Sequence, residues 1–489
     1  FLPGDDKFDE QLFAMSSIKG NDYRNIWSYF IEGGPENGVN LLKYILYLNS
    51  GIRKPPAAKK ISSVGIYWPD FNEINAETLQ TKWRIKKRPV IAITFYSALL
   101  QSGQTEVIDA LITALEKDYN CIPIHSKSFK DKKNRDVTRF LLKKYNPISV
   151  INLTGFSLSG ISSSKTIFDD ARRPVFQVIL SSMSEHEWQH SSKGLNNRDI
   201  IMSISLPEID GRIITKTIAF KEEISFDKIT QTKLLEYIPH DFGINYICNL
   251  VKNWSKLSVT SNEKKNIFIT LANYPNKDSR IANGVGLDTP SSIVHLIKKL
   301  EKLNYKIHNF PSNSDELMKK LISGQTNSHE KIKLKTNKYL SLDDYKNYFE
   351  DLPKNIQSAI NKKWGSIEKD PFTRGKNIIL PIQKFGNLSL GIQPSRGYNI
   401  DPKNSYHSPD LVPPHSYFAF YFWVKYKFKA HAIIQFGKHG NLEWLPGKSL
   451  SLSQNCYPDL ILGPTPLIYP FIVNDPGEGT QAKRRNAAV

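Results

Sequence analysis

The sequence is poor in the features that mark secreted and membrane-spanning proteins. Its cysteines, Cys121, Cys248 and Cys456, have spacings that fit neither a disulfide framework nor a CxxC zinc site. The longest aromatic run, residues 417–424, is far shorter than the ~20 apolar residues that span a bilayer. The opening FLPGDDKFDEQ lacks the basic and apolar regions of a signal peptide. We therefore expect a soluble, globular, cytoplasmic protein.

Both ends of the chain lack the marks of a complete reading frame. There is no initiator methionine, and the sequence stops abruptly at AKRRNAAV. We therefore expect a fragment that lacks both ends of a longer protein. At 489 residues the chain is still too long for one hydrophobic core, so three or four domains are expected.

The segment that most resembles a nucleotide-binding P-loop does not satisfy the motif. Residues 436–453, FGKHGNLEWLPGKSLSLS, contain a Gly-Lys-Ser triplet that begins at Gly447. A P-loop needs a glycine five positions earlier, where this chain has Leu442. Pro446 also removes one of the N–H donors that would surround a phosphate. We therefore expect any ATP to be handled by another polypeptide.

The formal net charge of +19 raises the question of nucleic-acid binding. Clustered Lys and Arg residues gain affinity for a polyanion by releasing counterions. The clusters here are short, such as KDKKNR at 130–135, and lie between elements or on solvated helical faces. The pattern favours a smaller polyanionic ligand over nucleic acid.

Strand and helix patterns alternate in the first half of the chain. Strands are predicted at 89–96, 121–126, 148–156 and 174–180, with helical segments such as EVIDALITALEKDY between them. This alternation predicts a mostly parallel sheet, whose ligands bind beyond the carboxyl ends of the strands. The loop GFSLSGISSSK (155–165) follows such a strand end and is either a ligand loop or a flexible surface loop.

A second α/β unit begins with a strand near residue 266 and a helix at 291–303, with Thr289 and Pro290 at its N-cap and N1 positions. We expect a multidomain α/β protein whose parallel-sheet units are Rossmann-like or periplasmic-binding-protein-like, with helical connectors. The expected parts are a helical segment at 1–60, α/β domains at 61–225 and 226–325, a helical connector at 326–375, and a truncated ligand- and metal-handling region at 376–489.

The segment SEHEWQH formally contains the zinc motif HExxH at 186–190. In zinc proteases this motif lies in the middle of a helix, with a third ligand downstream. Here it follows the strand at 174–180 closely and runs into SSKGLNN, which leaves little helix. A surface turn is the favoured interpretation.

Potential ligands converge in the last third of the chain. The group comprises His407, His415, His431, His439, Arg396, Asp401, Asp410 and Glu443. His439 follows the predicted strand AHAIIQF, and Glu443 would face it if NLEW forms a helical turn. Imidazole with carboxylate suits divalent metals and can also move protons. Each of these residues, taken alone, is more often structural than catalytic.

Long motifs carry a resemblance to a known family. KHGNLEWLPGK (438–448) and IVNDPGEGTQAKRR (472–485), with LPEIDGRIITKTIAFK (206–221) and LANYPNKDSRIANGVGLDTP (271–290) upstream, resemble the large subunit of aerobic cobaltochelatases, the CobN type. That family is related to the porphyrin-binding H subunit of magnesium chelatase. The resemblance covers essentially the whole chain.

The resemblance implies insertion of Co²⁺ into hydrogenobyrinic acid a,c-diamide during aerobic cobalamin synthesis, with ATP and Mg²⁺ on two AAA-type partner subunits. It implies Glu443 as the first choice for proton and metal handling and His439 as the second. His407 and His415 are further candidate metal ligands. The ring carries carboxylates, so the candidate substrate-binding cations are Arg396, Lys448, Lys483 and Arg484.

Two other functions remain open at this stage. The first is a magnesium-chelatase-type porphyrin-binding subunit, although KHGNLEWLPGK is closer to the cobalt family. The second is a non-catalytic tetrapyrrole-binding fragment, which is favoured if the truncation is biological.

Overall fold

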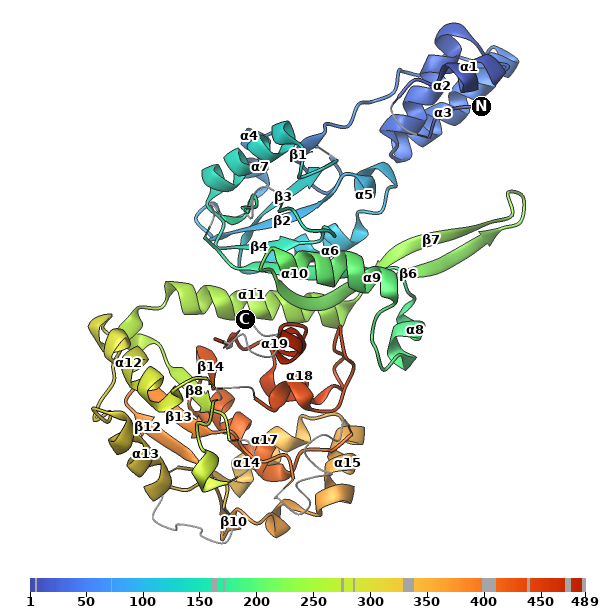
Figure 1. Ribbon diagram of the computed structural model, residues 1–489. Helices are drawn as coiled ribbons and strands as arrows, with labels where there is room; N and C mark the ends of the chain where they lie inside the picture. The colour runs from blue at the N-terminus through green and yellow to red at the C-terminus, as the bar shows by residue number, and fades with distance from the viewer. Residues whose placement is uncertain are drawn as a thin grey trace. The chain divides into compact units, whose positions relative to one another are not determined.

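The chain forms two units, each built around a sheet that contains parallel strands (Figure 1). The computed structural model describes residues 1–4, 7–71, 73–159, 165–169, 172–273, 277–284, 286–328, 338–397, 410–437, 440–470 and 476–485. Unit 1 comprises Phe1–Ser182, Ile201–Arg212 and Ile218–Ile244, and unit 2 comprises Met183–Ile200, Ile213–Thr217 and Asn245–Val489. Two of the divisions fall within elements, one in strand β6 (Ile213–Asp227) and one in helix α11 (Asp241–Val259).

Unit 1 begins with three helices, as the sequence predicts. They are α1 (Glu10–Met15), α2 (Gly20–Glu32) and α3 (Pro35–Ser50). Helix α3 ends at Gly51, whose φ of 64° is the left-handed conformation that glycine adopts without strain. Ile26 and Tyr29 of α2 pack with Leu41 and Tyr44 of α3 in a small core.

A seven-stranded sheet forms the centre of unit 1, in the order β1-β3-β2-β4-β5-β6-β7. The strands besides β6 are β1 (Val64–Ile66), β2 (Val90–Tyr96), β3 (Asn120–Ser126), β4 (Ser149–Asn152), β5 (Val175–Ser181) and β7 (Thr232–Pro239). Strands β3, β2, β4 and β5 run parallel, and β1 and β7 pair antiparallel with their neighbours. The predicted parallel strands are confirmed, and β4 is shorter than its prediction.

The spacing of apolar residues along the sequence explains the helices of unit 1, since it places these residues on one helical face. Helix α6 (Glu106–Leu115) has a polar face opposite a buried apolar face, which comprises Val107, Ile108, Leu111, Ile112 and Leu115. The remaining helices are α4 (Ala76–Lys82), α5 (Ala98–Gln101), α7 (Lys132–Tyr145), the π-helical turn η2 (Ile201–Ser205) and α10 (Leu206–Ile209).

A five-stranded sheet in the order β12-β13-β8-β14-β15 forms the centre of unit 2. Its strands are β8 (Ile267–Leu271), β12 (Ile382–Phe385), β13 (Leu388–Ile392), β14 (Ala432–Phe436) and β15 (Leu467–Ile468). Strands β13, β8, β14 and β15 are parallel, and β12 is antiparallel. β14 matches the strand that the sequence predicts before His439.

The two faces of this sheet are covered by different helices (Figure 1). α12 (Thr289–Lys302) and α13 (Ser314–Ser323) pack with Ile267, Ile269 and Leu271 on one face. Phe268 points to the other face, against the aromatic helix α17 (His415–Phe422). Gly391 allows this close packing, because a Cβ there would lie 2.5 Å from both Phe268 and Phe420.

The helix at 289–302 begins one residue earlier than the sequence predicts. Asp288 is the N-cap, and its carboxylate accepts a hydrogen bond from the Ser291 amide at 3.0 Å. Thr289 is therefore the first helical residue, because a carboxylate that satisfies a free N–H group is an effective cap.

The other elements of unit 2 complete its core. A small antiparallel sheet joins β10 (Thr373–Arg374), β11 (Asn377–Ile379) and β9 (Tyr339–Ser341). The helices are α8 (Glu185–His190), α9 (Asn197–Ile200), α14 (Leu342–Glu350), α15 (Lys354–Trp364), α18 (Tyr457–Leu462) and α19 (Pro476–Lys483). The short helical turns are η3 (Asn262–Lys264), η4 (Asp278–Arg280), η5 (Ile367–Lys369), η6 (Trp423–Lys427) and η7 (Leu442–Trp444).

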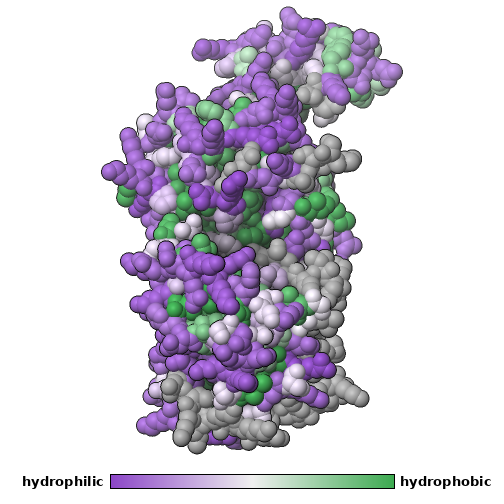
Figure 2. Space-filling model, turned by 60° about the vertical axis from the view of Figure 1, so that its left-hand side comes forward, coloured by the Kyte–Doolittle hydropathy of each residue, from purple (hydrophilic) through white to green (hydrophobic). Residues whose placement is uncertain are grey.

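The visible surface is mostly hydrophilic, with scattered apolar side chains (Figure 2). Within the described part of the chain, no helix is both long enough and apolar enough to cross a membrane.

Candidate functional site

The carboxyl ends of parallel strands in unit 2 meet at one edge of the five-stranded sheet. Gln393 follows β13, Gly440 and Glu443 come shortly after β14, and Tyr469 follows β15. Because all these strands run in the same direction, residues far apart in sequence are brought to one edge. This is the edge at which the sequence predicts a ligand site.

Glu443 is the buried carboxylate of this edge. It lies in the turn η7 and is 4% exposed. The Tyr469 hydroxyl donates to Glu443 Oε1 at 2.9 Å, and the Gly440 amide donates to the same hydroxyl at 2.5 Å. A Cβ at Gly440 would lie 3.1 Å from Glu443 Oε2, so a side chain there would crowd the second carboxylate oxygen.

Tyr469 is held in its neutral, proton-donating form. Burial raises the pKa of Tyr469 well above that of an exposed tyrosine, and the nearby Glu443 charge raises it further. Its hydroxyl therefore remains a donor to the carboxylate at neutral pH.

A polar network lies beside the carboxylate. Asn441 Oδ1 accepts from the Tyr417 hydroxyl at 2.6 Å, and Asn441 Nδ2 donates to the Pro394 carbonyl at 3.0 Å. Gln393 Nε2 donates to the Tyr421 hydroxyl at 2.9 Å. Burial is the main cause that raises the pKa values of Tyr417 and Tyr421. The network fixes the backbone around Glu443 with groups that stay neutral.

Arg485 clamps the segment that contains Glu443. Its guanidinium donates to the backbone carbonyls of Glu443 at 2.6 Å and Leu445 at 2.7 Å, and to those of Lys448 at 2.9 Å and Gly447 at 3.3 Å. Arg485 is 7% exposed, so these bonds are shielded from water. The path of residues 443–448 thus depends on one arginine near the end of the chain.

The structure places the predicted substrate-binding cations in different surroundings. Burial raises the pKa of Tyr417, and Arg396, which is buried after β13, lies close enough to oppose that rise in part. Lys483 ends α19 and Arg484 follows it, and both are half-buried.

Lys448 has a structural role in this arrangement. Its ammonium donates to the carbonyls of Trp188 at 2.6 Å, Gln189 at 3.0 Å and Ser191 at 2.7 Å, at the carboxyl end of α8. It also lies 5.2 Å from the centre of the Trp188 ring. With its donors used in this way, Lys448 caps a helix, and we do not include it in the proposed ligand site.

His415 also has a structural role. Its Nε2 donates to the Gly365 carbonyl at 2.9 Å, which leaves Nδ1 to accept from the Tyr345 hydroxyl at 2.7 Å. Both ring nitrogens are therefore used, and the ring is 1% exposed. This environment leaves no lone pair for a metal.

The structure brings no metal site together from the other candidate histidines and aspartates that it describes. His431 Nδ1 accepts from the Asn266 amide at 3.0 Å. Asp410 is exposed. The candidates His407, His439 and Asp401 lie outside the described residues. Among the residues that are described, no three His, Cys, Asp or Glu side chains are grouped to hold a metal ion.

The HExxH segment forms a short helix, α8, and not the predicted turn. Ser184 and Glu187 form a reciprocal capping box, in which the Glu187 carboxylate accepts from the Ser184 amide at 2.9 Å. This cap explains why six residues suffice for a helix. The capping glutamate is therefore already bound to the backbone.

The partners of Glu443 could not be found from the sequence. Tyr469 and Arg485 lie 26 and 42 positions away in sequence, so no local spacing links them to it. The only signals were their positions: Tyr469 directly follows a strand, and Arg485 belongs to the same basic run as Arg484.

The fold matches that of a known class of metal-inserting enzyme subunit. The catalytic subunit of cobaltochelatase from Mycobacterium tuberculosis superposes with a TM-score of 0.78 at 28% identity, over 99% of this chain and 41% of that one. Residues 27–489 match the family described as CobN/Magnesium Chelatase, and the chain belongs to this family.

Cobaltochelatase and magnesium-chelatase subunits both match nearly the whole chain. It is 42% identical to the aerobic cobaltochelatase subunit CobN of a Sinorhizobium species, over 100% of this chain and 39% of that protein. It is 26% identical to the H subunit of magnesium chelatase from Chlorobaculum parvum, over 99% of this chain and 38% of that protein. The chain thus spans about two fifths of the length of these relatives.

Proposed function

We propose that this chain is part of the tetrapyrrole-binding catalytic subunit of an ATP-dependent cobaltochelatase, which inserts Co²⁺ into hydrogenobyrinic acid a,c-diamide. The observation that carries the proposal is the buried Glu443 carboxylate at the carboxyl edge of the parallel sheet, held by Tyr469. Membership of the family supports the reaction class.

Metal insertion requires a group that accepts protons from the ring nitrogens, because each divalent ion that enters the ring replaces N–H protons. The Glu443 carboxylate is suited to this task. The Tyr469 hydroxyl donates to Oε1, and a Cβ at Gly440 would lie 3.1 Å from Oε2, so the glycine avoids a close contact with the carboxylate. We propose Glu443 as the proton acceptor and His439 as its partner for the metal, with His407 as a further candidate ligand.

The substrate carries carboxylates, and we propose Arg396, Lys483 and Arg484 as their partners. Arg396 lies on the same sheet edge as Glu443, and its burial strengthens a charge-assisted hydrogen bond. Lys483 ends α19, and Arg484 follows it directly before Arg485, the clamp of the Glu443 segment.

Two AAA-type subunits are the proposed partners, and they would bind ATP and Mg²⁺. The proposal is supported by Leu442 and Pro446, which spoil the P-loop-like segment of this chain. Cobalt is favoured over magnesium because the identity to the cobaltochelatase subunit is higher than the identity to the magnesium-chelatase subunit.

The test is reconstitution of the full-length protein with its two ATPase partners. Co²⁺ and Mg²⁺ should each be offered with hydrogenobyrinic acid a,c-diamide and with protoporphyrin, with and without ATP. We expect ATP-dependent insertion of Co²⁺ into the corrin precursor alone. Insertion of Mg²⁺ into protoporphyrin would assign the chain to the magnesium branch, and ring binding without any insertion would make it a non-catalytic binding protein.

A further inference from the structure

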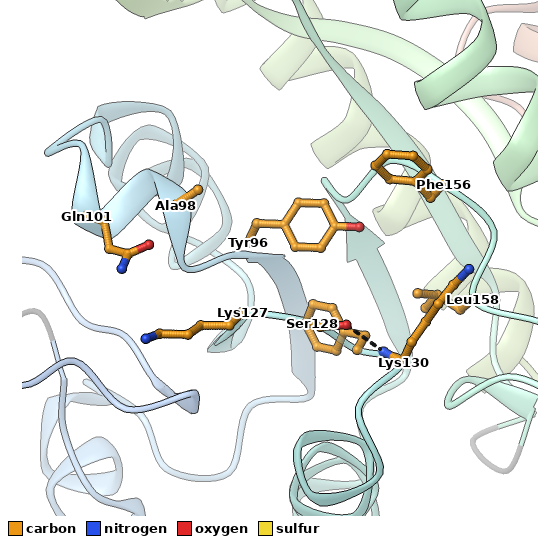
Figure 3. Close-up of a pocket in the computed structure, with 9 residues that line it drawn as sticks. Tyr96, Ala98, Gln101, Lys127, Ser128, Lys130, Phe156 and Leu158 are labelled. Atoms are coloured by element: carbon orange, nitrogen blue, oxygen red, sulfur yellow. Dashed lines mark hydrogen bonds between the residues drawn. The ribbon is translucent and has the colours of Figure 1, made fainter. Parts of the chain in front are cut away.

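A pocket in unit 1 lies outside the site described above (Figure 3). Its volume is about 560 Å³, within the ~300–1,000 Å³ of typical small-molecule sites. The lining residues are Tyr96, Ala98, Gln101, Lys127, Ser128, Phe129, Lys130, Phe156 and Leu158. They come from the chain segments that follow β2, β3 and β4, so the pocket lies at the carboxyl edge of the parallel sheet.

The topology of the sheet explains the position of this pocket. From β2 the chain continues to β3 on one side, whereas from β4 it continues to β5 on the other side. Adjacent strands whose connections leave in opposite directions create a crevice beyond their carboxyl ends, where α/β proteins bind ligands. Tyr96 ends β2, and Phe156 and Leu158 follow β4, so the pocket occupies this crevice.

One wall of the pocket is fixed by a buried ion pair. Arg212 Nη2 lies 2.6 Å from Asp210 Oδ2 and donates to the Phe156 carbonyl at 3.1 Å. The Asp210 carboxylate accepts from the Leu158 amide at 2.7 Å and from the Ser159 amide at 3.1 Å. The loop that the sequence predicts as either a ligand loop or a flexible loop is therefore tied down at residues 156–159.

Phe156 is held in an unfavourable conformation at the pocket. Its φ is 62°, in the left-handed region that bulky residues avoid, and its amide donates to the Met202 carbonyl at 2.7 Å. The side chain is nevertheless 42% exposed. Such strain persists where the surroundings fix it, and it is typical of ligand-binding positions. The hydrophobic effect alone would have buried this ring.

A network of side chains lies next to the end of β2, directly after Tyr96. Ser97 Oγ lies 2.9 Å from His125 Nδ1, and His125 Nε2 lies 2.9 Å from Glu73 Oε1. The three residues resemble a nucleophile-activating triad, but Ser97 and His125 are fully buried and no substrate can reach the hydroxyl. The network instead anchors the turn that presents Tyr96.

The rim of the pocket is cationic and its walls are aromatic. Figure 3 shows Tyr96 near the middle of the lining, with Lys127 to one side and Lys130 and Phe156 to the other. Both lysines are exposed, and the lining residues that the structure describes include no acidic side chain. Aromatic walls with cations at the mouth of the pocket favour a flat amphipathic ligand, which has an apolar face and anionic groups at its edge.

We propose that this pocket is a second ligand site, which binds a flat amphipathic anion against Tyr96 and Phe156, with carboxylates at Lys127 and Lys130. The anion preference follows from the pocket alone. The choice of a carboxylated tetrapyrrole as the occupant rests on the proposed function, whose ring substrate has this chemistry. The site would bind one carboxylate-bearing edge of the ring, and Glu443 would take no part in this binding.

The test is a fluorescence titration of the complete chain with coproporphyrin, a tetracarboxylate, and with its uncharged tetramethyl ester. The variants are Lys127→Ala with Lys130→Ala, and Phe156→Gly, which removes the ring and relieves the strained φ. The matched control is Lys86→Ala with Lys87→Ala, which removes the same charge from exposed residues at the amino-terminal edge of the sheet. ATP serves as a phosphate-bearing competitor.

We expect one binding phase of coproporphyrin to weaken at least tenfold in the double lysine variant and in Phe156→Gly, but not in the control. This phase should be absent with the ester, unaffected by ATP and retained in Glu443→Gln, so it is independent of the metal-insertion test. Equal binding by the double lysine variant and the control, displacement by ATP, or no binding by the unaltered chain would each overturn the proposal.

Discussion

Replacing Lys448 by Met tests whether this residue caps a helix or binds substrate. The side chain keeps its length and apolar stem but loses its donors. The Trp188 carbonyl is the most buried of its three acceptors, whereas water can reach those of Gln189 and Ser191. A buried carbonyl left unsatisfied costs about 1–3 kcal/mol, and a hydrogen bond to a charged group contributes about 1.5–3 kcal/mol.

Because the contributions are not additive, we expect a loss of about 3 kcal/mol in the free energy of unfolding. For a unit of this size that corresponds to a fall of about 6–12 °C in the melting temperature. The measurement is thermal unfolding by circular dichroism, with coproporphyrin binding measured on the same preparations. Lys298→Met, at an exposed position of α12, is the control.

The two roles give opposite results. A helix cap predicts a lowered melting temperature with porphyrin affinity unchanged in the folded protein. An unchanged melting temperature with weakened porphyrin binding would mean that Lys448 contacts the ligand, and the structural role assigned to it would be refuted.

Three further predictions concern unit 2. Arg396→Ala should weaken binding of the carboxylated ring by about 1.5–3 kcal/mol, with weaker dependence on salt, and a lowered melting temperature with unchanged affinity would instead make it structural. Burial lowers the pKa of His415, so the unfolded chain binds its proton at higher pH than the folded chain, and stability should fall as the pH drops below about 6.5. His415→Gln should flatten that dependence in denaturant titrations between pH 7 and 5, and an identical slope would contradict the assignment. Gly440→Ala should press on Glu443 Oε2 and slow metal insertion at least tenfold in the reconstituted complex, whereas full activity would show that the carboxylate has room to move.

The parallel strands could be predicted because each buried strand is a continuous apolar run. Residues 90–96 and 120–126 are buried almost throughout, and such runs stand out between polar helices. Their boundaries were less accurate where the apolar pattern continues past the paired residues, as after β4.

The pairing of distant strands could not be predicted. β8 lies in the region expected to form the second α/β domain, whereas its neighbours β13 and β14 lie in the region expected to begin at 376. One sheet therefore contains strands from two expected domains. Local periodicity gives the strand but carries no information about its partners.

The site was only partly accessible from the sequence. Glu443 could be proposed because it follows a strand end and lies in a motif that resembles the cobaltochelatase family. Charge and residue type alone could not separate cations that bind ligand from cations that bind backbone. Lys448 and Arg485 hold main-chain carbonyls, a role that depends on where distant loops lie. The same holds for His415, whose ring nitrogens are used by Tyr345 and Gly365.

The central claim is that the Glu443 carboxylate accepts protons during metal insertion. The most direct measurement is the rate of Co²⁺ insertion by full-length Glu443→Gln in the reconstituted complex, together with its affinity for the corrin precursor. Glutamine keeps the shape of the side chain and can still accept a hydrogen bond from Tyr469. We predict a rate at least ~10²-fold lower, the usual contribution of a positioned acid or base, with affinity within a few-fold of the unaltered protein. Insertion at the full rate would contradict the account.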